Sequence, residues 1–333
     1  MMRRATDNRG SALVLALAVL GLVVAFGFAM YNASALDRLA LTNEHNKDRA
    51  NLDAKSGVEH AIAELQAAIA SGQVDSKLNT DLEVTLNLYR LAGRAPDAAS
   101  QAPVVDDRYT SKAIVHITDE SARMNVNLAP PAVLMSILKI DGERARQLRE
   151  RLPRLDGSAS TENENRRWLS SVDELASLPL LPANTLTPER RADLTTFSAL
   201  EMKSPAGFVN LNTASKSVLE ATLAVTPDVA DKVMLARPLT SLDALVAAAG
   251  KGPDTFNFKP AADDPGGMPK ELAFSSRCFR IRSTASLTRN NDDPNAKPIQ
   301  SIVEAVVQFP ENEAPRVVYW NEPPVGAAST TAK

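Results

Sequence analysis

The most distinct pattern of apolar and polar positions lies near the N-terminus of the chain. Residues 10–36 contain no charged side chain, and the centre of this segment, residues 11–30, reads SALVLALAVLGLVVAFGFAM. Twenty residues in a helix are about 30 Å long, which is the thickness of the hydrocarbon core of a bilayer. The pattern therefore predicts a transmembrane helix over residues 11–36.

A second pattern follows, in which apolar residues recur three and four positions apart, as on one face of an amphipathic helix. Its members are Leu52, Ala54, Val58, Ala61, Ile62, Leu65, Ala68 and Ile69. Ser71-Gly72 suits the end of such a helix, because glycine readily adopts the left-handed conformation. We expect one helix from about residue 11 to about residue 70, with its first half in lipid and its second half packed on a globular domain.

Apolar and polar residues alternate in several later segments, which is the pattern of half-buried strands. This alternation predicts strands at residues 112–118, 277–287, 298–309 and 316–320. The polar segment 288–298 (TRNNDDPNAKP) predicts a hairpin loop, and we expect the tail at residues 323–333 to be disordered.

Between the first two predicted strands lie about 160 residues with little strand pattern, and they contain an internal repeat. Residues 127–134 match residues 212–219 at an offset of 85, and the register continues to Pro153 and Pro238. A later match, of residues 169–175 to residues 239–245, has an offset of 70. The first copy therefore carries about 15 extra residues, which we place in the polar segment 157–165.

Each copy of the repeat predicts a small helical unit. Asn127 and Asn212 stand at chain turns, where an asparagine side chain can bond nearby backbone groups. Two helices in a hairpin-like arrangement follow, and then a third that Ser171 or Ser241 caps. Glu174 completes a capping box in the first copy. We expect the two copies to pack into one helical domain.

The composition is that of an ordinary globular protein, with 44% hydrophobic and 23% charged residues. The net charge of −3 gives no general attraction for nucleic acid, and the single cysteine, Cys278, excludes an internal disulfide. The sequence contains no G-x-G-x-x-G, P-loop, G-x-S-x-G or H-E-x-x-H motif. We therefore predict a protein that is not an enzyme and has no cofactor. Asp263-Asp264 and Asp292-Asp293 could hold calcium in loops, but neither pair has the alternating ligands of an EF-hand.

The N-terminal segment has three interpretations. Residues 1–9 hold three arginines and one aspartate, so the positive-inside rule keeps the N-terminus cytoplasmic and sends the rest outward. A cleaved secretory signal needs an apolar region of about 7–15 residues, which is shorter than this one. A plain membrane anchor is the second interpretation. The third is a class III signal of the pilin type, in which cleavage between Gly10 and Ser11 leaves the apolar helix on the mature chain.

Taken together, these features resemble the type II secretion minor pseudopilin K family (general secretion pathway protein K). The leader ending in Arg9-Gly10, the apolar helix, the stretch 49–65, the inserted helices with VNLNTASKSVL and the final strands carry this resemblance. It extends from the leader to about residue 309, and the order of the parts is its specific element. The resemblance implies a bitopic inner-membrane protein whose globular part is periplasmic.

The resemblance also implies processing, partners and a role. Prepilin peptidase would cleave between Gly10 and Ser11 and methylate the amine of Ser11. The mature chain would join the minor pseudopilins I and J at the tip of a pseudopilus, above the major pseudopilin and the inner-membrane secretion platform. There it would initiate assembly and support the export of folded proteins across the outer membrane.

The fifth residue after the predicted cleavage site is Leu15, where most pilins and pseudopilins carry a glutamate that neutralises the N-terminal amine of a neighbour. An unpaired charge is costly in lipid, so a subunit without this glutamate suits the end of a filament. The K family lacks it too. Two features depart from the family pattern: Ser11 replaces the usual apolar first residue, and the loop 254–269 has no counterpart, so family calcium sites cannot be transferred.

The predicted fold is α+β: a long N-terminal helix that spans the membrane in its first half, a pilin-like antiparallel sheet packed on its second half, and a large all-α insertion of two repeated units near residues 125–182 and 209–250. The predicted segments are the leader 1–10, the transmembrane helix 11–36, the rest of the helix and the first strand 37–118, the insertion 119–276, the remaining strands 277–322 and the tail 323–333. Partner contacts are expected at Leu15, Leu52, Val58, Ile62, Leu65 and Ile69.

An alternative function follows from residues 212–219, which also resemble the helix-hairpin-helix modules of DNA-uptake receptors. Such modules bind phosphates through backbone N–H groups of a glycine-rich hairpin. The corresponding turns are residues 139–142, with one glycine, and residues 224–227, with a proline. The arginines of residues 144–154 are interleaved with glutamates, as on a solvated helix. This alternative is a membrane-anchored DNA-binding protein of a DNA-uptake or type IV pilus system, whereas the pseudopilin interpretation expects no nucleic acid.

Overall fold

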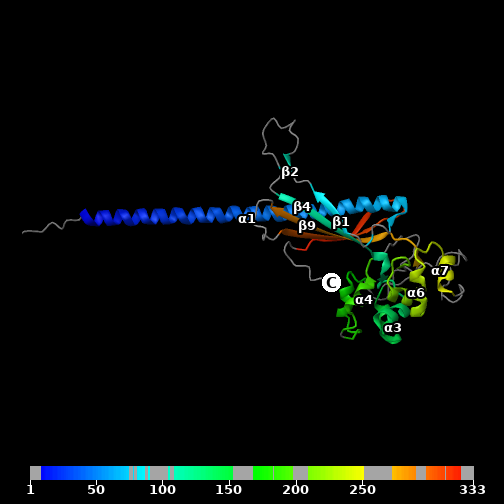
Figure 1. Cartoon of the computed structure of the whole chain (residues 1–333). Coiled ribbons are helices and arrows are strands. Elements are labelled where there is room, and N and C mark those ends of the chain that lie inside the picture. Colours follow the sequence, from blue (N-terminus) through cyan, green and yellow to red (C-terminus); the bar gives the residue numbers. More distant parts are fainter. Residues whose placement is uncertain are drawn as a thin grey trace, which may run out of the picture.

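A computed structural model of the chain describes residues 9–74, 78, 81–86, 89–90, 104–105, 109–152, 168–182, 184–197, 209–250, 272–289, 298–311 and 313–323. For residues 9–12, 85–86, 89–90, 104–105 and 289 it describes the backbone alone. Figure 1 shows a long helix, a sheet packed along its second half, and a helical body beyond one end of the sheet.

The helix α1 (Arg9–Ser71) is continuous over 63 residues. Its sequence holds no proline, and alanine and leucine, which favour helices, are frequent in it. The helix stops at Gly72, whose φ of +70° is left-handed, and Gln73 N–H donates to Ala68 O at 2.8 Å. This is the geometry of a glycine C-cap. The predicted end of the helix at Ser71-Gly72 is therefore confirmed.

Five antiparallel strands form the main sheet, in the order β1-β4-β9-β10-β11. They are β1 (Asp81–Leu86), β4 (Tyr109–Asp119), β9 (Cys278–Arg289), β10 (Ile299–Gln308) and β11 (Arg316–Asn321). A separate ribbon pairs β2 (Tyr89–Arg90) with β3 (Val104–Val105). The strands expected from alternation are present. Strand β1 was not predicted, although its sequence DLEVTL also alternates.

The first core lies between α1 and the inner face of the sheet. Alternate residues of the strands point toward the helix, and the period of α1 turns one stripe toward them. The buried members include Ala54, Val58, Ala61, Leu65, Val115, Ile117, Phe279, Ile281, Val303 and Val307. At Gly57 the helix lies so close to the sheet that a Cβ atom would be 2.3 Å from Ser283 Oγ. Glycine therefore permits this approach.

The chain between β4 and β9 folds into a helical body with its own core. Its elements are η3 (Glu120–Ala122), β5 (Met124–Asn125), α2 (Pro131–Leu138), α3 (Gly142–Arg151), η4 (Val172–Ser177), α4 (Pro188–Ala192), β6 (Leu194–Thr195), β7 (Val209–Asn210), α5 (Lys216–Leu223), α6 (Pro227–Leu235), α7 (Leu242–Ala249) and β8 (Leu272–Ala273). Two short parallel pairs bracket the two copies of the repeat: β5 pairs with β6 around the first copy, and β7 pairs with β8 around the second.

The two copies of the repeat share their internal hydrogen bonds. Asn127 Nδ2 donates to Leu169 O at 3.0 Å, and Leu169 N–H donates to Asn127 Oδ1 at 2.9 Å. Asn212 exchanges the same two bonds with Leu239, at 2.9 and 2.7 Å. Each asparagine thus bonds a backbone far along the chain, whereas the sequence suggested nearby groups. The third helix of the first copy, η4, is a 3₁₀ helix, and its predicted capping box at Ser171 is present.

The predicted fold class is confirmed: the chain is α+β, with a long apolar N-terminal helix, an antiparallel sheet and a two-copy helical insertion. The insertion begins where β4 ends and returns to the sheet at the start of β9. The insertion is thus attached to the far end of the sheet, away from the first half of α1, on which no strand packs (Figure 1).

Candidate functional site

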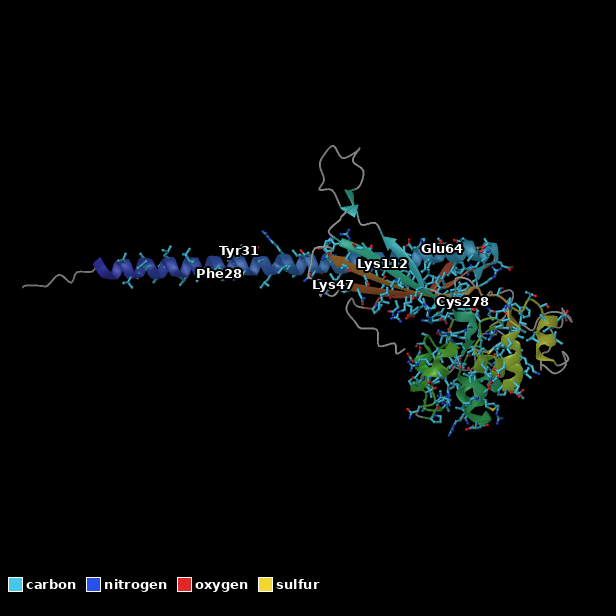
Figure 2. All side chains as sticks on the ribbon, viewed as in Figure 1. Phe28, Tyr31, Lys47, Glu64, Lys112 and Cys278 are labelled. Atoms are coloured by element: carbon cyan, nitrogen blue, oxygen red, sulfur yellow. The ribbon has the colours of Figure 1, made fainter. Side chains whose placement is uncertain are left out.

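The first half of α1 is the candidate membrane anchor. It is the one helix in the described part of the chain long and apolar enough to cross a bilayer, and its most apolar window has a mean hydropathy of 2.8 with none of it buried. Figure 2 shows Phe28 and Tyr31 on a bare part of this helix, whereas Glu64 lies where the helix runs along the sheet. Apolar residues on all sides of a helix suit lipid and not water. By length and composition, the first half of α1 is therefore compatible with a single-pass membrane anchor.

The predicted cleavage site lies at the start of α1. The backbone of Gly10 and Ser11 belongs to the helix, but their side chains and residues 1–8 lie outside the described residues. Cleavage between them and methylation of Ser11 therefore stay predictions.

The predicted partner-contact residues divide into three groups. Leu15 and Leu52 are 68% and 62% exposed and therefore accessible. Val58 and Leu65 are fully buried against the chain's own sheet, so the expectation that they contact a partner is wrong. Ile62 and Ile69 are partly buried and pack against the same core. The amphipathic stripe packs on the globular domain, as the sequence predicted for the second half of the helix, so the chain itself covers these side chains.

Further leucines of α1 are exposed beyond the predicted transmembrane segment. Leu39, Leu41 and Leu52 are all more than half exposed. With 3.6 residues per turn, Leu39 lies on a different side of the helix from Leu41 and Leu52, so these leucines are scattered and form no single patch.

A buried polar cluster joins the helical insertion to the sheet, at the last residues of β4. Asp119 accepts hydrogen bonds from Ser121 N–H at 2.8 Å, from Asn210 Nδ2 at 3.2 Å, and from the hydroxyls of Thr213 and Ser276. Burial raises the pKa of Asp119, although these donors act in the opposite direction. The carboxylate therefore ties the second copy of the repeat to the sheet.

The neighbouring Glu120 is also fully buried and ties the first copy to the sheet. It accepts from Thr195 Oγ1 and pairs with Arg123 at 3.3 Å and with Arg280 of β9. Arg280 also pairs with Glu304 of β10. Burial lowers the pKa of Arg280, but Glu120 and Glu304 outweigh it, so the net pKa is raised. Sequence reasoning did not identify this network, although two acidic residues directly after a strand were a visible signal.

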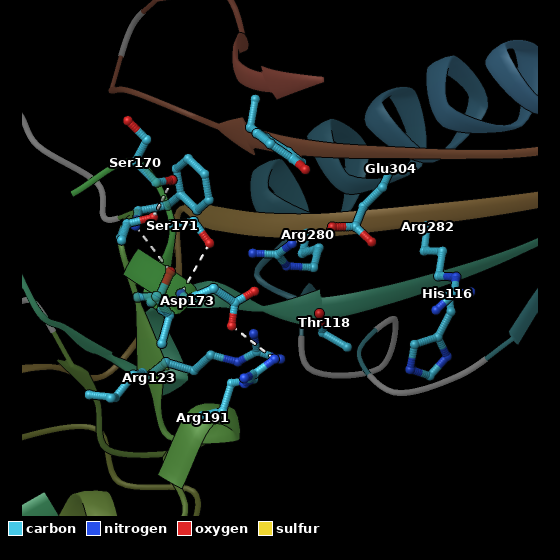
Figure 3. Close-up of a pocket in the computed structure, with 16 residues that line it drawn as sticks. His116, Thr118, Arg123, Ser170, Ser171, Asp173, Arg191, Arg280, Arg282 and Glu304 are labelled. Carbon is cyan, nitrogen blue, oxygen red and sulfur yellow. Dashed lines mark hydrogen bonds and ion pairs between the residues drawn. The ribbon is translucent and has the colours of Figure 1, made fainter. Parts of the chain in front are cut away.

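A cavity of about 440 Å³ opens beside this network, between the outer face of the sheet and the first copy of the repeat (Figure 3). Residues of the four strands β4, β9, β10 and β11 form one wall: His116, Thr118, Arg280, Arg282, Glu304 and Tyr319. The insertion forms the other: Arg123, Ser170, Ser171, Val172, Asp173, Arg191, Leu194, Thr195, Thr196 and Phe197. We call this cavity the elbow pocket.

Few side chains among the described residues are placed to bind a metal ion or to react. No group of three or more His, Cys, Asp or Glu residues among them could hold a metal ion. Asp263-Asp264 and Asp292-Asp293, the pairs considered for calcium, lie outside the described residues. Burial raises the pKa of the Cys278 thiol well above its ordinary value, so this thiol stays protonated and unreactive.

The first of the two hairpins considered for DNA binding has its own carboxylate in place, whereas Thr226 at the second makes no capping hydrogen bond with its side chain. Asp141 caps α3 by accepting from Arg144 N–H at 2.9 Å, and it pairs with the guanidinium of Arg144 at 3.3 Å. Arg146 pairs with Glu143. A carboxylate therefore occupies the helix N-terminus that a phosphate would need, and it repels an approaching polyanion. The geometry gives no support to the DNA-binding alternative.

Comparison with known proteins gives a likeness in structure, not in sequence. No family model matches the chain, and no curated protein matches its sequence. The structure is similar to a chain in the crystal structure of the GspK-GspI-GspJ complex from the type 2 secretion system of enterotoxigenic Escherichia coli. The two chains are 16% identical, the match covers 64% of this chain and 80% of that one, and the TM-score is 0.42.

Proposed function

We propose that the chain is a minor pseudopilin of the K type, a non-enzymatic subunit at the tip of a periplasmic type II secretion pseudopilus. The observation that carries the proposal is α1, a single helix that is bare and apolar in its first half and forms the core of the folded domain in its second. Such a helix can anchor the subunit in the inner membrane, with the sheet and the insertion in the periplasm, and then join a bundle of similar helices. The charge of residues 1–9 supports a cytoplasmic N-terminus.

A place at the tip is supported by two features. Leu15 offers no carboxylate to neutralise the terminal amine of a neighbour, so the subunit is poorly suited to the interior of a shaft. The insertion projects sideways from the far end of the sheet (Figure 1), where it would collide with neighbours at close helical spacing. A filament end leaves room for this projection. The partners are then the I and J minor pseudopilins, the major pseudopilin below them and the inner-membrane secretion platform, and assembly initiated here supports the export of folded proteins.

The first test concerns processing by prepilin peptidase. We expect the mass of the membrane-extracted chain to correspond to removal of residues 1–10 with one added methyl group on Ser11. Gly10→Leu should abolish this processing, because the peptidase site must accommodate the residue before the cut. Gly21→Leu is the matched control, since a Cβ at Gly21 has no neighbour within 4 Å. Retention of Met1, or a cut beyond residue 25, contradicts the proposal.

The second test concerns the position in the filament. Arg144 lies on an exposed turn of the insertion, so Arg144→Cys can carry a maleimide gold label, while the buried Cys278 stays unlabelled. We expect gold at filament ends only, and labels spaced along the shaft contradict the proposal. Because Asp119 accepts a hydrogen bond from Ser276, the two ends of the insertion are adjacent. A short Gly-Ser linker can therefore replace residues 123–275, and this variant should insert in the membrane but fail to support secretion.

A further inference from the structure

The elbow pocket has the size of small-molecule binding sites, which span about 300–1,000 Å³, and its two walls come from parts of the chain far apart in sequence. We propose that the elbow pocket binds a neutral sugar, a ring whose edge carries hydroxyl groups and whose faces carry C–H bonds. This inference goes beyond the proposed function and does not depend on it.

The acidic and basic side chains that line the pocket already have partners. Asp173 pairs with Arg191 at 2.8 Å, and Glu304 pairs with Arg280. The remaining basic side chains of the lining also interact with other groups of the chain. A charged ligand would have to compete with one of these pairs, whereas a neutral ligand leaves them all in place. The pairing therefore favours a ligand without charge.

Paired charges still offer hydrogen bonds to hydroxyl groups. A guanidinium carries more N–H donors, and a carboxylate more acceptor sites, than one ion pair uses. The pair of Asp173 and Arg191 stands at the rim, with side chains 62% and 53% exposed, so its remaining donors and acceptors are accessible. Of two neighbouring hydroxyls of a sugar, one can donate to Asp173 while the other accepts from Arg191. A hydroxyl that replaces a water molecule there can reproduce the hydrogen bonds of that water.

Hydroxyl side chains extend this polar surface to both walls. Ser170 lines the side of the insertion and Thr118 the side of the sheet (Figure 3). Thr196 Oγ1 donates to Ser170 O at 3.1 Å, which holds the rim of the insertion together. Each hydroxyl both donates and accepts, as the hydroxyls of a sugar do. The two walls therefore offer hydrogen bonds of both kinds to the edge of a ring that lies between them.

An aromatic corner suits the C–H face of a sugar. Phe197 of the insertion and Tyr319 of β11 have ring centroids 5.4 Å apart, and their planes are tilted by 50°, so the rings are not stacked face to face. Both side chains line the pocket and are only partly buried. C–H bonds carry a small positive charge, which the negative face of an aromatic ring attracts.

The corner is fixed before a ligand arrives. The Arg280 guanidinium lies 5.7 and 6.0 Å from the centroids of Phe197 and Tyr319, and it is itself held by Glu120 and Glu304. Preorganised groups lose little entropy on binding. The elbow pocket thus combines an apolar corner with neutralised polar groups, which matches the two kinds of surface on a sugar ring.

The test applies the full chain in fluorescent lipid nanodiscs to an array of immobilised neutral oligosaccharides, with sulfated and uronic acid oligosaccharides beside them and empty nanodiscs as background. We expect binding to a neutral oligosaccharide and no stronger binding to its acidic counterparts. Competition with the corresponding free monosaccharide identifies the source of the ligand. Displacement assigns the pocket to a free sugar, and retention of the bound oligosaccharide assigns it to a glycan chain.

Two variants of the rim pair distinguish a neutral ligand from a charged one. Asp173→Ala and Arg191→Ala should each weaken binding by about tenfold, because each removes a hydrogen bond to a charged group. An anion would instead bind more tightly to Asp173→Ala, and a cation more tightly to Arg191→Ala. Both side chains are more than half exposed, so we expect both variants to keep the melting temperature of the wild type.

The matched controls are Lys216→Ala and Asp231→Ala, which break an exposed ion pair of 2.7 Å that does not line the pocket. They should leave the binding of the oligosaccharide unchanged. Binding to no neutral oligosaccharide, opposite effects of the two rim variants, or an equal loss in the controls overturns the proposal. None of these outcomes bears on the N-terminal mass that tests the pseudopilin proposal.

Discussion

The sheet is attached to the rest of the chain by two junctions of opposite chemistry. Its inner face meets α1 through the apolar junction, which comprises the core residues of α1 and the strands that include Val58 and Leu65. The end of β4 meets the insertion through the polar junction, which is built on Asp119, Glu120 and Arg280. Apolar burial is strong but not directional, whereas hydrogen bonds fix both distance and angle. The contrast indicates that α1 supplies stability and the polar junction sets the orientation of the insertion.

The contrast is not absolute, because polar contacts also lie beside the apolar junction, among them the ion pair of Lys55 and Glu322 and the pair of Asp53 and Ser111. Asp53 of α1 accepts a hydrogen bond from Ser111 Oγ of β4 at 2.5 Å. Burial raises the pKa of Asp53, while Ser111 and the charge of Arg49 act in the opposite direction. This pair fixes the register of α1 along β4 near the point where the helix leaves the sheet.

The largest expected effect comes from breaking the polar junction on one side. Glu120→Ala leaves Arg280 with Glu304 alone and leaves Thr195 without its acceptor. Removing one member of a buried ion pair costs about 3–5 kcal/mol, so we expect the free energy of unfolding to fall by that amount. Urea denaturation followed by circular dichroism measures it.

A paired replacement sharpens this prediction. In Glu120→Leu with Arg280→Met, apolar side chains of similar size replace both charges, and such exchanges are often neutral or stabilising. We expect the free energy of unfolding to recover, because neither charge is then left buried without its partner. A double variant as unstable as Glu120→Ala would show that the polar junction holds the fold itself and not the orientation.

The second prediction compares two leucines of α1. Leu65 is fully buried in the apolar junction, whereas Leu52 points outward. Leu65→Ala should lower the free energy of unfolding by about 2–5 kcal/mol, because it removes buried methyl groups and leaves a cavity. Leu52→Ala should change it by less than about 0.5 kcal/mol. Thermal melts of the two detergent-solubilised variants make the comparison.

Partner binding should show the reverse order. Leu52→Ala is expected to reduce co-purification with the I and J minor pseudopilins proposed as partners, since the Leu52 side chain is exposed. Leu65→Ala should affect co-purification only in proportion to the unfolded fraction. Equal melting temperatures for the two variants would contradict the placement of the stripe against the sheet.

The apolar junction could be predicted from the sequence, and the polar junction could not. The spacing of Val58 and Leu65 indicates a buried stripe, and alternation in β4 and β9 indicates the strands that cover it. Such periodic patterns arise because each secondary structure repeats its geometry. Asp119 and Glu120 follow no period, and exposed loops commonly carry the same residues. Several of their donors lie far along the chain, from Thr195 at 75 positions to Arg280 at 160, and only the folded chain brings them together.

The same distinction explains the repeat and the pocket. The offset of 85 located both asparagine turns, because equivalent turns share their sequence, and each copy then forms the same pair of hydrogen bonds. The elbow pocket depends instead on how the insertion meets the sheet. Phe197 and Tyr319 were unremarkable in the sequence, and their contact follows from the polar junction. Elements with a local sequence pattern were therefore predictable, but the placement of the helical insertion against the sheet was not.

The smallest expected effect is the pH dependence of the polar junction. Burial raises the pKa of Asp119 above its ordinary value of 3.8, so the folded chain holds this proton more tightly than the unfolded chain does. The contribution of Asp119 to stability is therefore most favourable below pH 3.8, and it declines as the pH rises through the higher pKa of the folded state. In Asp119→Asn this group cannot titrate.

We therefore expect the difference in unfolding free energy, wild type minus Asp119→Asn, to decrease as the pH rises from 3.8 and to level off above the folded-state pKa. Denaturant titrations of both proteins at closely spaced pH values measure this difference, and the other titrating groups cancel in it. Asp141→Asn is the control, because hydrogen bonding to Arg144 N–H lowers the pKa of that exposed carboxyl. Its difference should change in the opposite direction. A difference for Asp119→Asn that increases with pH would show that the hydrogen bonds from Ser276, Thr213, Ser121 and Asn210 outweigh burial, and that the polar junction is built around a stable carboxylate.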